Sequence, residues 1–428
     1  MRVKSYLTNS RSGHDYRSSR IFNVSAVLFL LLFFFLFNSC GKAPDTLKEE
    51  WTGTWGTAQQ LVEPHNMPPA PGLSNNTLRQ VVRPSIGGDH IRVTFSNEFS
   101  TLPVVLKAAH IASSKGGSTI DSETDTPLTF KGNPETTIEP GNTVTSDPLA
   151  FDLKPRADIA ITVYFGDTSY DITGHPGSRT TSYIREGNMV TAPEFSDASK
   201  TDHWYVIDSI EVLGPELMDA AVVIGDSITD GRGSGTNRQN RWPDELAERL
   251  RKNPGTENVA VLNMGIGGNC VLRDCLGPAA VKRFDGDVLE QKGIRWLIIL
   301  EGINDIGGSR SREDSERAAK DLIEAFEIMI EKSHAKGILV YGATLLPFGS
   351  SFYDSDHHES ARQAVNSWIR TGGRFDGIID LEKALEDPEN PHHMLPAADT
   401  GDHLHPNETG HRMMAGAVDL NLFKSKGK

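Results

Sequence analysis

The sequence predicts an antiparallel β-sandwich over residues 51–213, followed by a three-layer α/β/α domain with a parallel sheet over residues 215–424. Up to about residue 213, apolar and polar residues alternate in short segments that turn residues interrupt. Beyond residue 215, continuous apolar runs alternate with helical stripes. A chain of 428 residues also exceeds what one ordinary hydrophobic core holds, which favours two domains.

In the first region, residues 90–96 and 158–165 alternate apolar and polar side chains with period two. Further candidate strands cover residues 104–111, 143–153 and 204–212. Clusters of Gly, Pro, Asn and Asp separate these segments, and no convincing helical stripe interrupts them. Several short alternating strands with frequent turns are typical of a sandwich of two antiparallel sheets.

The second region contains continuous apolar runs of the kind found in strands buried on both faces. These runs cover residues 218–224, 259–262, 296–300, 338–341 and 378–379. Between them, residues 313–336 and 358–371 carry apolar side chains on one face of a helix, and Gly337 and Gly372 follow as helix ends. Alternation of strand and helix predicts a parallel sheet with helices on both faces.

The N-terminus is typical of an export signal. Basic residues precede an apolar run over residues 24–37, which is short for a helix that spans a bilayer. Cys40 follows the run and a small residue, so residues 1–39 are expected to be a lipoprotein-type signal peptide, with Cys40 lipidated and residues 40–50 forming a tether. The alternatives are a plain signal peptide or an uncleaved anchor. All three export the rest of the chain, to a bacterial envelope or to the medium.

The formal net charge of −14 excludes some partners. Residues 1–39 hold five basic residues and one acidic residue, so their removal leaves a chain that is more acidic still. Such a surface repels phosphate backbones, and nucleic acid is therefore not an expected partner. Membrane contact is expected only through the anchor at Cys40.

Cys270 and Cys275 are the cysteines that remain after Cys40. In an exported protein, a close pair of cysteines favours a disulfide, although spacing alone leaves two free thiols open. Two cysteines without a nearby histidine do not make a zinc site, and no metal is expected.

A serine stands directly after the first apolar run of the second region, in the segment Gly-Asp-Ser-Ile-Thr-Asp-Gly over residues 225–231. Small and turn-forming neighbours let Ser227 present its hydroxyl at the carboxyl end of the sheet, where ligands of such sheets bind. The alternative is a serine that only caps a helix.

Three further segments favour a catalytic serine. Residues 263–268 form a glycine block whose backbone N–H groups can approach a ligand closely, and Asn304 follows the third apolar run. Asp402 stands three residues before His405, so its carboxylate can accept from the Nδ1–H of the His405 ring while Nε2 of that ring faces the serine. Asp226 and Asp305 adjoin these residues and are expected to fix loops.

These residues, in this order, resemble the SGNH (GDSL-type) hydrolase family: GDS, a glycine block, GxND and DxxHP. The resemblance implies a flavodoxin-like α/β/α domain and a serine esterase that needs no cofactor. It implies that Ser227 is the nucleophile, that His405 is the general base and then acid, and that Asp402 orients His405. The Ser227 N–H, the Gly268 N–H and the Asn304 side chain would form the oxyanion hole.

The resemblance extends to a two-part SGNH subfamily that carries an upstream β-rich region. Three segments carry this resemblance: Trp-Thr-Gly-Thr-Trp at residues 51–55, Thr-Leu-Arg-Gln-Val-Val at residues 77–82 and Glu-Gly-Ile-Asn-Asp-Ile-Gly at residues 301–307. Members include bacterial xylanase-cluster acylhydrolases and arylesterases.

The sequence therefore favours an exported esterase that removes small acyl groups, above all acetyl, from a carbohydrate. The alternatives are an esterase of the same mechanism acting on lipid or aryl esters, and an inert, lipid-anchored glycan-binding protein. The β-region is expected to form a wall of the substrate cleft, with Trp55, His65 and Asn66 as candidate contributors. For Trp51 and Trp55, packing between the two domains is the favoured role, and a surface for a glycan is the alternative.

Overall fold

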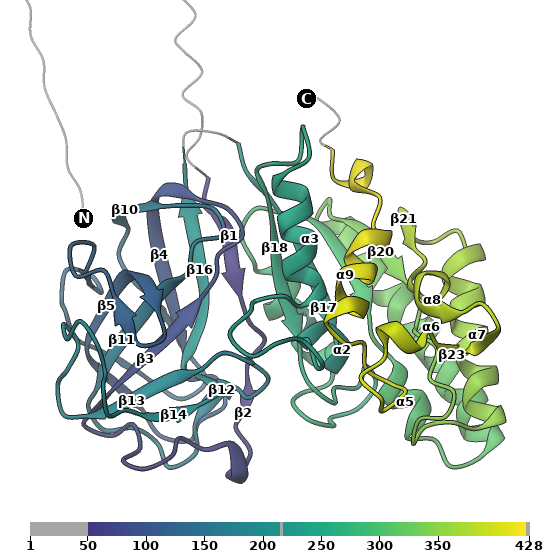
Figure 1. Cartoon of the computed structure of the whole chain (residues 1–428), viewed down its shortest axis with the longest axis horizontal. Coiled ribbons are helices and arrows are strands. Elements are labelled where there is room, and N and C mark those ends of the chain that lie inside the picture. Colours follow the sequence, from purple (N-terminus) through teal and green to yellow (C-terminus); the bar gives the residue numbers. More distant parts are fainter. Residues whose placement is uncertain (1–49, 215–216, 425–428) are drawn as a thin grey trace, which may run out of the picture. The chain divides into compact units, whose positions relative to one another are not determined.

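The computed structural model of the protein describes residues 50–214 and 217–424 (Figure 1). The expected signal peptide over residues 1–39, the expected lipidation site Cys40 and the tether up to residue 49 lie outside the described residues. Residues 50–214 are called the β-region here, and residues 217–424 the α/β region. Both belong to one compact unit, Glu49–Lys428.

The β-region consists of antiparallel sheets that pack around a shared apolar core, as the alternating pattern predicts. One sheet has the order β1-β16-β4-β10, with β9 beside β4; another has the order β14-β13-β3-β11-β5-β6, with β7 and β8 beside β5; a small third sheet joins β15, β12 and β2. The strands are β1 (Thr52–Gly56), β2 (Gln60–Leu61), β3 (Asn76–Val82), β4 (Gly88–Ser96), β5 (Val104–Gly116), β6 (Thr119–Ile120), β7 (Thr126–Leu128), β8 (Thr136–Ile138), β9 (Thr143–Thr145), β10 (Leu149–Leu153), β11 (Ile159–Phe165), β12 (Thr173–His175), β13 (Ser182–Glu186), β14 (Ser199–Thr201), β15 (Trp204–Tyr205) and β16 (Ile207–Leu213).

Two expected strands are each divided in the structure. The expected strand over residues 143–153 becomes β9 and β10, because the chain leaves the ladder at Ser146, whose N–H donates to Val93 O and whose hydroxyl accepts from Val93 N–H. The expected strand over residues 204–212 breaks at Val206, whose φ of 65° turns the chain from the small sheet into the sheet of β16. Turns of this kind depend on the neighbouring sheets rather than on local alternation.

The α/β region contains a five-stranded parallel sheet of order β18-β17-β19-β20-β21, as predicted. Its strands are β17 (Asp219–Gly225), β18 (Val259–Gly265), β19 (Ile294–Leu300), β20 (Leu339–Ala343) and β21 (Gly377–Ile379), and a hairpin of β22 (Glu386–Asp387) and β23 (Asn390–Met394) follows. The central strands are apolar along nearly their whole length because helices cover both faces of the sheet.

The helices of this region are α2 (Ser227–Asp230), α3 (Trp242–Arg251), α4 (Ala280–Phe284), α5 (Ile303–Gly307), α6 (Arg312–Ala335), α7 (Asp356–Thr371), α8 (Leu381–Leu385) and α9 (Glu408–Ala417). The chain steps to one side of β17 to form β18 and to the other side to form β19, so right-handed crossovers place α3 on one face of the sheet and α4, α6 and α7 on the other. After the last strand of the sheet, the chain returns as α9 to contact α3 (Figure 1), whereas α6 contacts α4 and α7. None of the helices in residues 50–214 and 217–424 is both long and apolar enough to cross a membrane.

The two long helices begin and end where the sequence predicts. The hydroxyl of Ser311 accepts from the Asp314 N–H at the start of α6, and the hydroxyl of Ser355 accepts from the His358 N–H at the start of α7. Gly337 follows α6 with a φ of 76°, a left-handed conformation that glycine adopts without a steric penalty.

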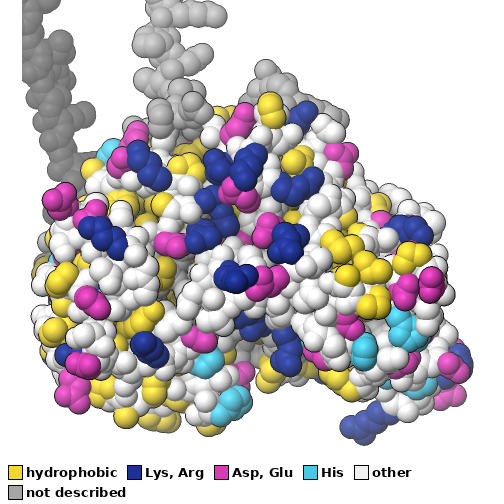
Figure 2. Space-filling model, viewed as in Figure 1, with side chains coloured by type: hydrophobic (Ala, Val, Ile, Leu, Met, Phe, Trp, Pro, Cys, Tyr) yellow, Lys and Arg dark blue, Asp and Glu magenta, His cyan; other side chains and the backbone are white. Residues whose placement is uncertain are grey.

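The β-region is joined to the edge of the parallel sheet. Thr57, just after β1, forms a parallel bridge with Asn263 of β18, and Ser85 Oγ bonds to Val261 O at 2.8 Å. Arg156 also pairs with Asp244 of α3 at 3.3 Å. On the face of the molecule shown in Figure 2, basic and acidic side chains gather over the middle. The β-region thereby covers a sheet edge whose unpaired backbone would otherwise be exposed.

Candidate active site

The strand-to-helix turn after β17 presents Ser227. Asp226 caps α2 through a 2.9 Å bond from the Ile228 N–H, and Ser227 is the first residue of that short helix. Gly265 of β18 lies against this turn, where an added Cβ would be 2.2 Å from Asp230 N. The alternative from the sequence, a serine that only caps the helix, does not hold, because Asp226 is the cap.

Ser227, His405 and Asp402 form a chain of hydrogen bonds. Ser227 Oγ lies 2.9 Å from His405 Nε2, and His405 Nδ1 lies 2.7 Å from Asp402 Oδ2. The N–H groups of Leu404 and His405 donate to Asp402 Oδ1 at 3.0 and 2.8 Å. The loop before α9 therefore fixes the carboxylate, the ring and the distance to the serine together.

The electrostatics of the triad suit a general base. Burial opposes ionisation of Asp402, but the backbone N–H groups of His405 and Leu404 and the His405 ring hold its pKa well below the usual range. Burial lowers the pKa of His405, Asp402 opposes that shift, and the cations Arg232 and Arg179 add to it. His405 is therefore neutral at neutral pH, with Nε2 able to accept the proton of Ser227.

The three expected oxyanion donors meet at the same cavity. Gly268 has a φ of 71°, and an added Cβ there would lie 2.8 Å from the side chain of Leu276. One Asn304 Nδ2–H donates to Asn269 O at 2.7 Å, which leaves the other N–H of that amide for a ligand. Ser227, Gly268 and Asn304 all line the cavity.

Tyr353 belongs to this site although nothing in its local sequence indicates it. Its hydroxyl donates to Asn304 Oδ1 at 3.0 Å, and that bond sets the orientation of the Asn304 amide. Tyr353 lies in the loop between β20 and α7, where its carbonyl bonds to the ring of His358 at 2.6 Å. His358 is therefore a buried structural residue.

Arg283 is a second residue of the site that no local sequence pattern indicates. Its buried guanidinium donates to Gly225 O at 3.1 Å, Met264 O at 2.7 Å and Asn269 Oδ1 at 3.0 Å. It thereby ties together the ends of β17 and β18 and the glycine block. These partners lie 14 to 58 positions away along the chain, so no local motif could reveal the role.

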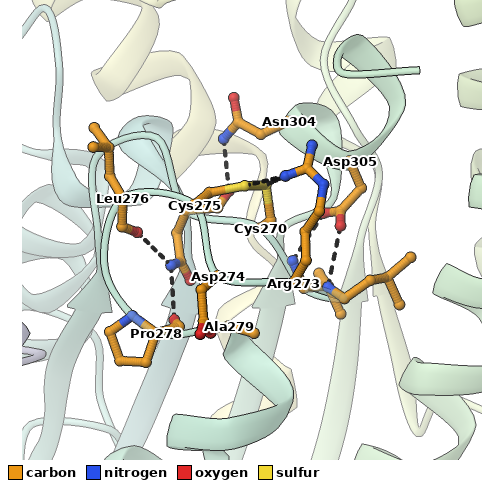
Figure 3. Close-up of a disulfide and its surroundings, with 12 residues drawn as sticks. Cys270, Arg273, Asp274, Cys275, Leu276, Pro278, Ala279, Asn304 and Asp305 are labelled. Carbon is orange, nitrogen blue, oxygen red and sulfur yellow. Dashed lines mark hydrogen bonds between the residues drawn. A yellow bond between two sulfur atoms is a disulfide. The ribbon is translucent and has the colours of Figure 1, made fainter. Parts of the chain in front are cut away.

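Cys270 and Cys275 are joined in a disulfide beside the oxyanion site (Figure 3). Arg273 lies against both sulfur atoms, and the carboxylate of Asp305 accepts from the N–H groups of Val271 and Leu272 at 2.8 and 3.1 Å. Asp305 therefore fixes the loop, which is the role expected for it. Leu276, directly after the disulfide, covers Gly268.

The β-region supplies one wall of the catalytic cavity, which encloses about 490 Å³. Of the contributors expected from the sequence, Asn66 lines it, but Trp55 and His65 do not. Trp55 is buried against Trp204, with their ring centroids 5.0 Å apart, and His65 is exposed. The β-region residues that line the cavity are Gln60, Glu63, Asn66, Pro176, Gly177, Arg179 and His203.

The rings of His403 and His405 bond to different partners and do not form a shared metal site. His403 turns away with a φ of 62°, and its Nδ1 bonds to Asp399 at 2.7 Å, while His405 bonds to Ser227 and Asp402. Within residues 50–214 and 217–424, no group of three or more His, Cys, Asp or Glu side chains is arranged to hold a metal ion.

Three solved structures similar to the chain illustrate its likeness to known proteins. A lipolytic protein of the G-D-S-L family from Desulfitobacterium hafniense is 23% identical, with a TM-score of 0.36, and the match covers 46% of this chain and 96% of that one. An acylhydrolase from Bacteroides fragilis is 20% identical, with a TM-score of 0.33 and coverage of 47% and 88%. The acetylxylan esterase Axe2 from Geobacillus stearothermophilus is 20% identical, with a TM-score of 0.36 and coverage of 47% and 93%.

No curated protein matches the sequence. Residues 223–413, from within β17 to within α9, match the family described as GDSL-like Lipase/Acylhydrolase. That segment contains Ser227, Gly268, Asn304, Asp402 and His405. The C-terminal part of this chain therefore belongs to the GDSL-like lipase/acylhydrolase (SGNH) family of carboxylic ester hydrolases.

Proposed function

We propose that the protein removes small acyl groups, most often acetyl, from a carbohydrate outside the cytoplasm, through an acyl-enzyme on Ser227. The observation that carries the proposal is the wall of the catalytic cavity: polar side chains of the β-region face the triad. Ser227 and His405 contribute to the same cavity, so a substrate bound at the serine lies against that wall.

In the first half-reaction, His405 Nε2 takes the proton of Ser227 as Oγ attacks the ester carbonyl. The resulting oxyanion receives hydrogen bonds from the N–H groups of Ser227 and Gly268 and from the Asn304 amide. His405 then returns the proton to the departing sugar hydroxyl, which leaves Ser227 acylated. In the second half, His405 deprotonates a water molecule that attacks the acyl-enzyme, and Ser227 leaves as the protonated alcohol.

The lining of the cavity favours a short acyl group on a polar alcohol. The side chains of Gln60, Glu63 and Asn66 lie on one wall, where they can bond to sugar hydroxyls. A long acyl chain would need a continuous apolar surface, because each buried CH₂ contributes about 0.8 kcal/mol. The apolar side chains of the cavity are few, and Leu276 and Phe352 among them are 50% and 74% exposed.

The same two side chains favour a second candidate, hydrolysis of aryl esters. Exposed Phe352 at the rim of the cavity could pack against an aromatic leaving group as well as against the apolar face of a sugar ring. The mechanism would be identical, and only the alcohol would differ.

Export and lipid anchoring at Cys40 are part of the proposal. The apolar run over residues 24–37 and the cysteine that follows support them. The disulfide between Cys270 and Cys275 is of the kind that persists in oxidising compartments. Mass spectrometry of the mature N-terminus from a bacterial host tests this part: a diacylglyceryl group on Cys40 supports it, and an unmodified Met1 contradicts it.

Acyl release from a panel of acetylated polysaccharides, measured beside p-nitrophenyl esters of increasing chain length, tests the substrate. We expect acetate release from at least one polysaccharide, and we expect kcat/KM on the p-nitrophenyl esters to fall steeply beyond four carbons. Ser227→Ala is the matched control for background hydrolysis. Rates that rise with chain length, or activity on aryl esters with none on any carbohydrate, would reject the carbohydrate assignment.

A further inference from the structure

Two arginines line the catalytic cavity together with Ser227 and His405. Arg179 comes from the loop between β12 and β13 in the β-region, and Arg232 follows α2 in the α/β region. Arg179 has a φ of 48°, a left-handed conformation that an arginine adopts only when its surroundings hold it there. The β-region and the α/β region thus each contribute one cation to the cavity that holds Ser227 and His405.

Asp230, the nearest acid to Arg179, does not accept from all the N–H donors of the guanidinium. The contact between Arg179 and Asp230 is long, 3.5 Å, and the buried Nε of Arg179 has no hydrogen-bond partner among the described residues. Asp230 already accepts from His175 Nε2 at 3.0 Å, and His175 Nδ1 lies 2.9 Å from Ala58 O. Asp230 therefore has a hydrogen-bond partner in His175 as well as its long contact with Arg179.

Arg232 is equally available. Its side chain is 63% exposed, and its nearest acid is Asp402, at 3.9 Å from Nε. That carboxylate already binds the His405 ring and two backbone N–H groups. Glu63, which lines the cavity together with Asp230, accepts from Gln60 at 2.6 Å and from Asn66 at 3.0 Å.

The cations beside His405 work against catalysis in the free enzyme, because they disfavour the imidazolium that forms when Ser227 attacks. An anion bound to them would remove that penalty in the enzyme–substrate complex. The planar guanidinium presents paired donors that match a carboxylate.

We propose that the acylated sugar carries a carboxylate, as a uronic acid does, and that Arg179 and Arg232 bind this group beside the scissile ester. This inference rests on the proposed carbohydrate esterase function and names its substrate class. Selectivity for the acidic sugar would then come from a pair of residues to which both regions of the chain contribute.

The test compares an O-acetylated uronic acid oligosaccharide with the same compound converted to its neutral carboxamide. We expect wild-type kcat/KM to be about tenfold or more higher on the acid, as charge-assisted hydrogen bonds imply, and the preference to shrink with added NaCl. Arg232→Gln and Arg179→Gln should each bring the ratio toward one by lowering the rate on the acid. Arg179→Lys keeps the charge without the planar fork and should retain part of the preference.

Arg317→Gln, on the exposed side of α6, is the matched control and should leave the ratio unchanged. Arg232→Gln removes a mostly exposed side chain and is expected to fold even if Arg179→Gln does not. A wild-type ratio near one overturns the inference while leaving the carbohydrate esterase assignment intact. Equal losses on both substrates in the Arg232 variant also overturn it, since they would assign the cations to the reaction itself. Absence of acetate release from both compounds, with p-nitrophenyl acetate still cleaved, would instead count against the proposed function.

Discussion

At the scale of single residues, the site depends on the proton path from Ser227 to His405. The 2.9 Å bond between Oγ and Nε2 places the buried His405 ring as the base for Ser227. Ser227→Ala should therefore lower kcat on p-nitrophenyl acetate by about a thousandfold or more. Its melting temperature should stay within about 1 °C of wild type, because a small hydroxyl at the cavity surface adds little to the core. Residual activity above a thousandth, in protein free of wild-type enzyme, would exclude Ser227 as the nucleophile.

Tyr353 should act through Asn304. Tyr353→Phe removes the donor to Asn304 Oδ1 and keeps the ring, so the amide can rotate away from the oxyanion. We expect kcat to fall about three- to tenfold with KM unchanged, which is less than the roughly hundredfold or greater loss from deleting an oxyanion donor, as in Asn304→Ala. Tyr170→Phe, at a 78% exposed position, serves as the control. If Tyr353→Phe changes KM alone, Tyr353 contacts substrate rather than orienting Asn304.

The pH profile follows from the lowered pKa of His405. Protonation of His405 removes the base, so kcat/KM falls as the pH drops through its pKa. Burial and the cations Arg232 and Arg179 lower that pKa, so the acid limb should lie below pH 6.5, the ordinary histidine value. Arg232→Gln removes one cation, which favours the imidazolium. With a neutral ester as substrate, the acid limb of the kcat/KM profile should therefore shift to higher pH. A wild-type limb above pH 6.5, or a downward shift in the variant, would contradict this account.

At the scale of elements, the disulfide loop is expected to matter more for activity than for stability. Closing a loop with a sequence separation of five contributes about 2 kcal/mol in the chain-entropy account, far less than a bridge across a long loop. Cys270→Ala/Cys275→Ala should lower the melting temperature by only about 2–3 °C for a unit of this size. The activity should fall about tenfold, because Leu276 and the glycine block lose their support. A large drop in melting temperature with normal kcat would show that the bridge serves folding instead.

At the scale of the whole molecule, the β-region both covers the sheet edge and walls the catalytic cavity. Deleting it would expose β18 and break the Ser85–Val261 bonds, so a truncated α/β region is not expected to be soluble. Asn66→Ala tests the contribution of the cavity wall while leaving the β-region docked on β18. It should lower kcat/KM on an acetylated polysaccharide several-fold and leave p-nitrophenyl acetate unchanged, whereas Asn133→Ala, in an exposed turn, should change neither. Equal losses on both substrates would assign the wall to support of the fold.

Local patterns along the chain are enough to predict the two fold classes and the order of the catalytic segments. Period-two alternation, continuous apolar runs and helical stripes each reflect which faces of one element are buried, so a short window of sequence carries them. The same holds for Ser227 and for Asp402 with His405, because a strand end or a three-residue turn places them. Parallel strands then bring their carboxyl ends to one edge.

How the β-region meets the triad becomes visible only in the folded protein. The structure replaces Trp55 and His65 with Arg179 and His203 as cavity residues, and it adds Tyr353 behind Asn304. These contacts join segments that lie tens to more than a hundred positions apart, and loops without a repeating pattern supply them. Their geometry follows from how Thr57 and Ser85 dock on β18, and no periodicity in the chain encodes that docking.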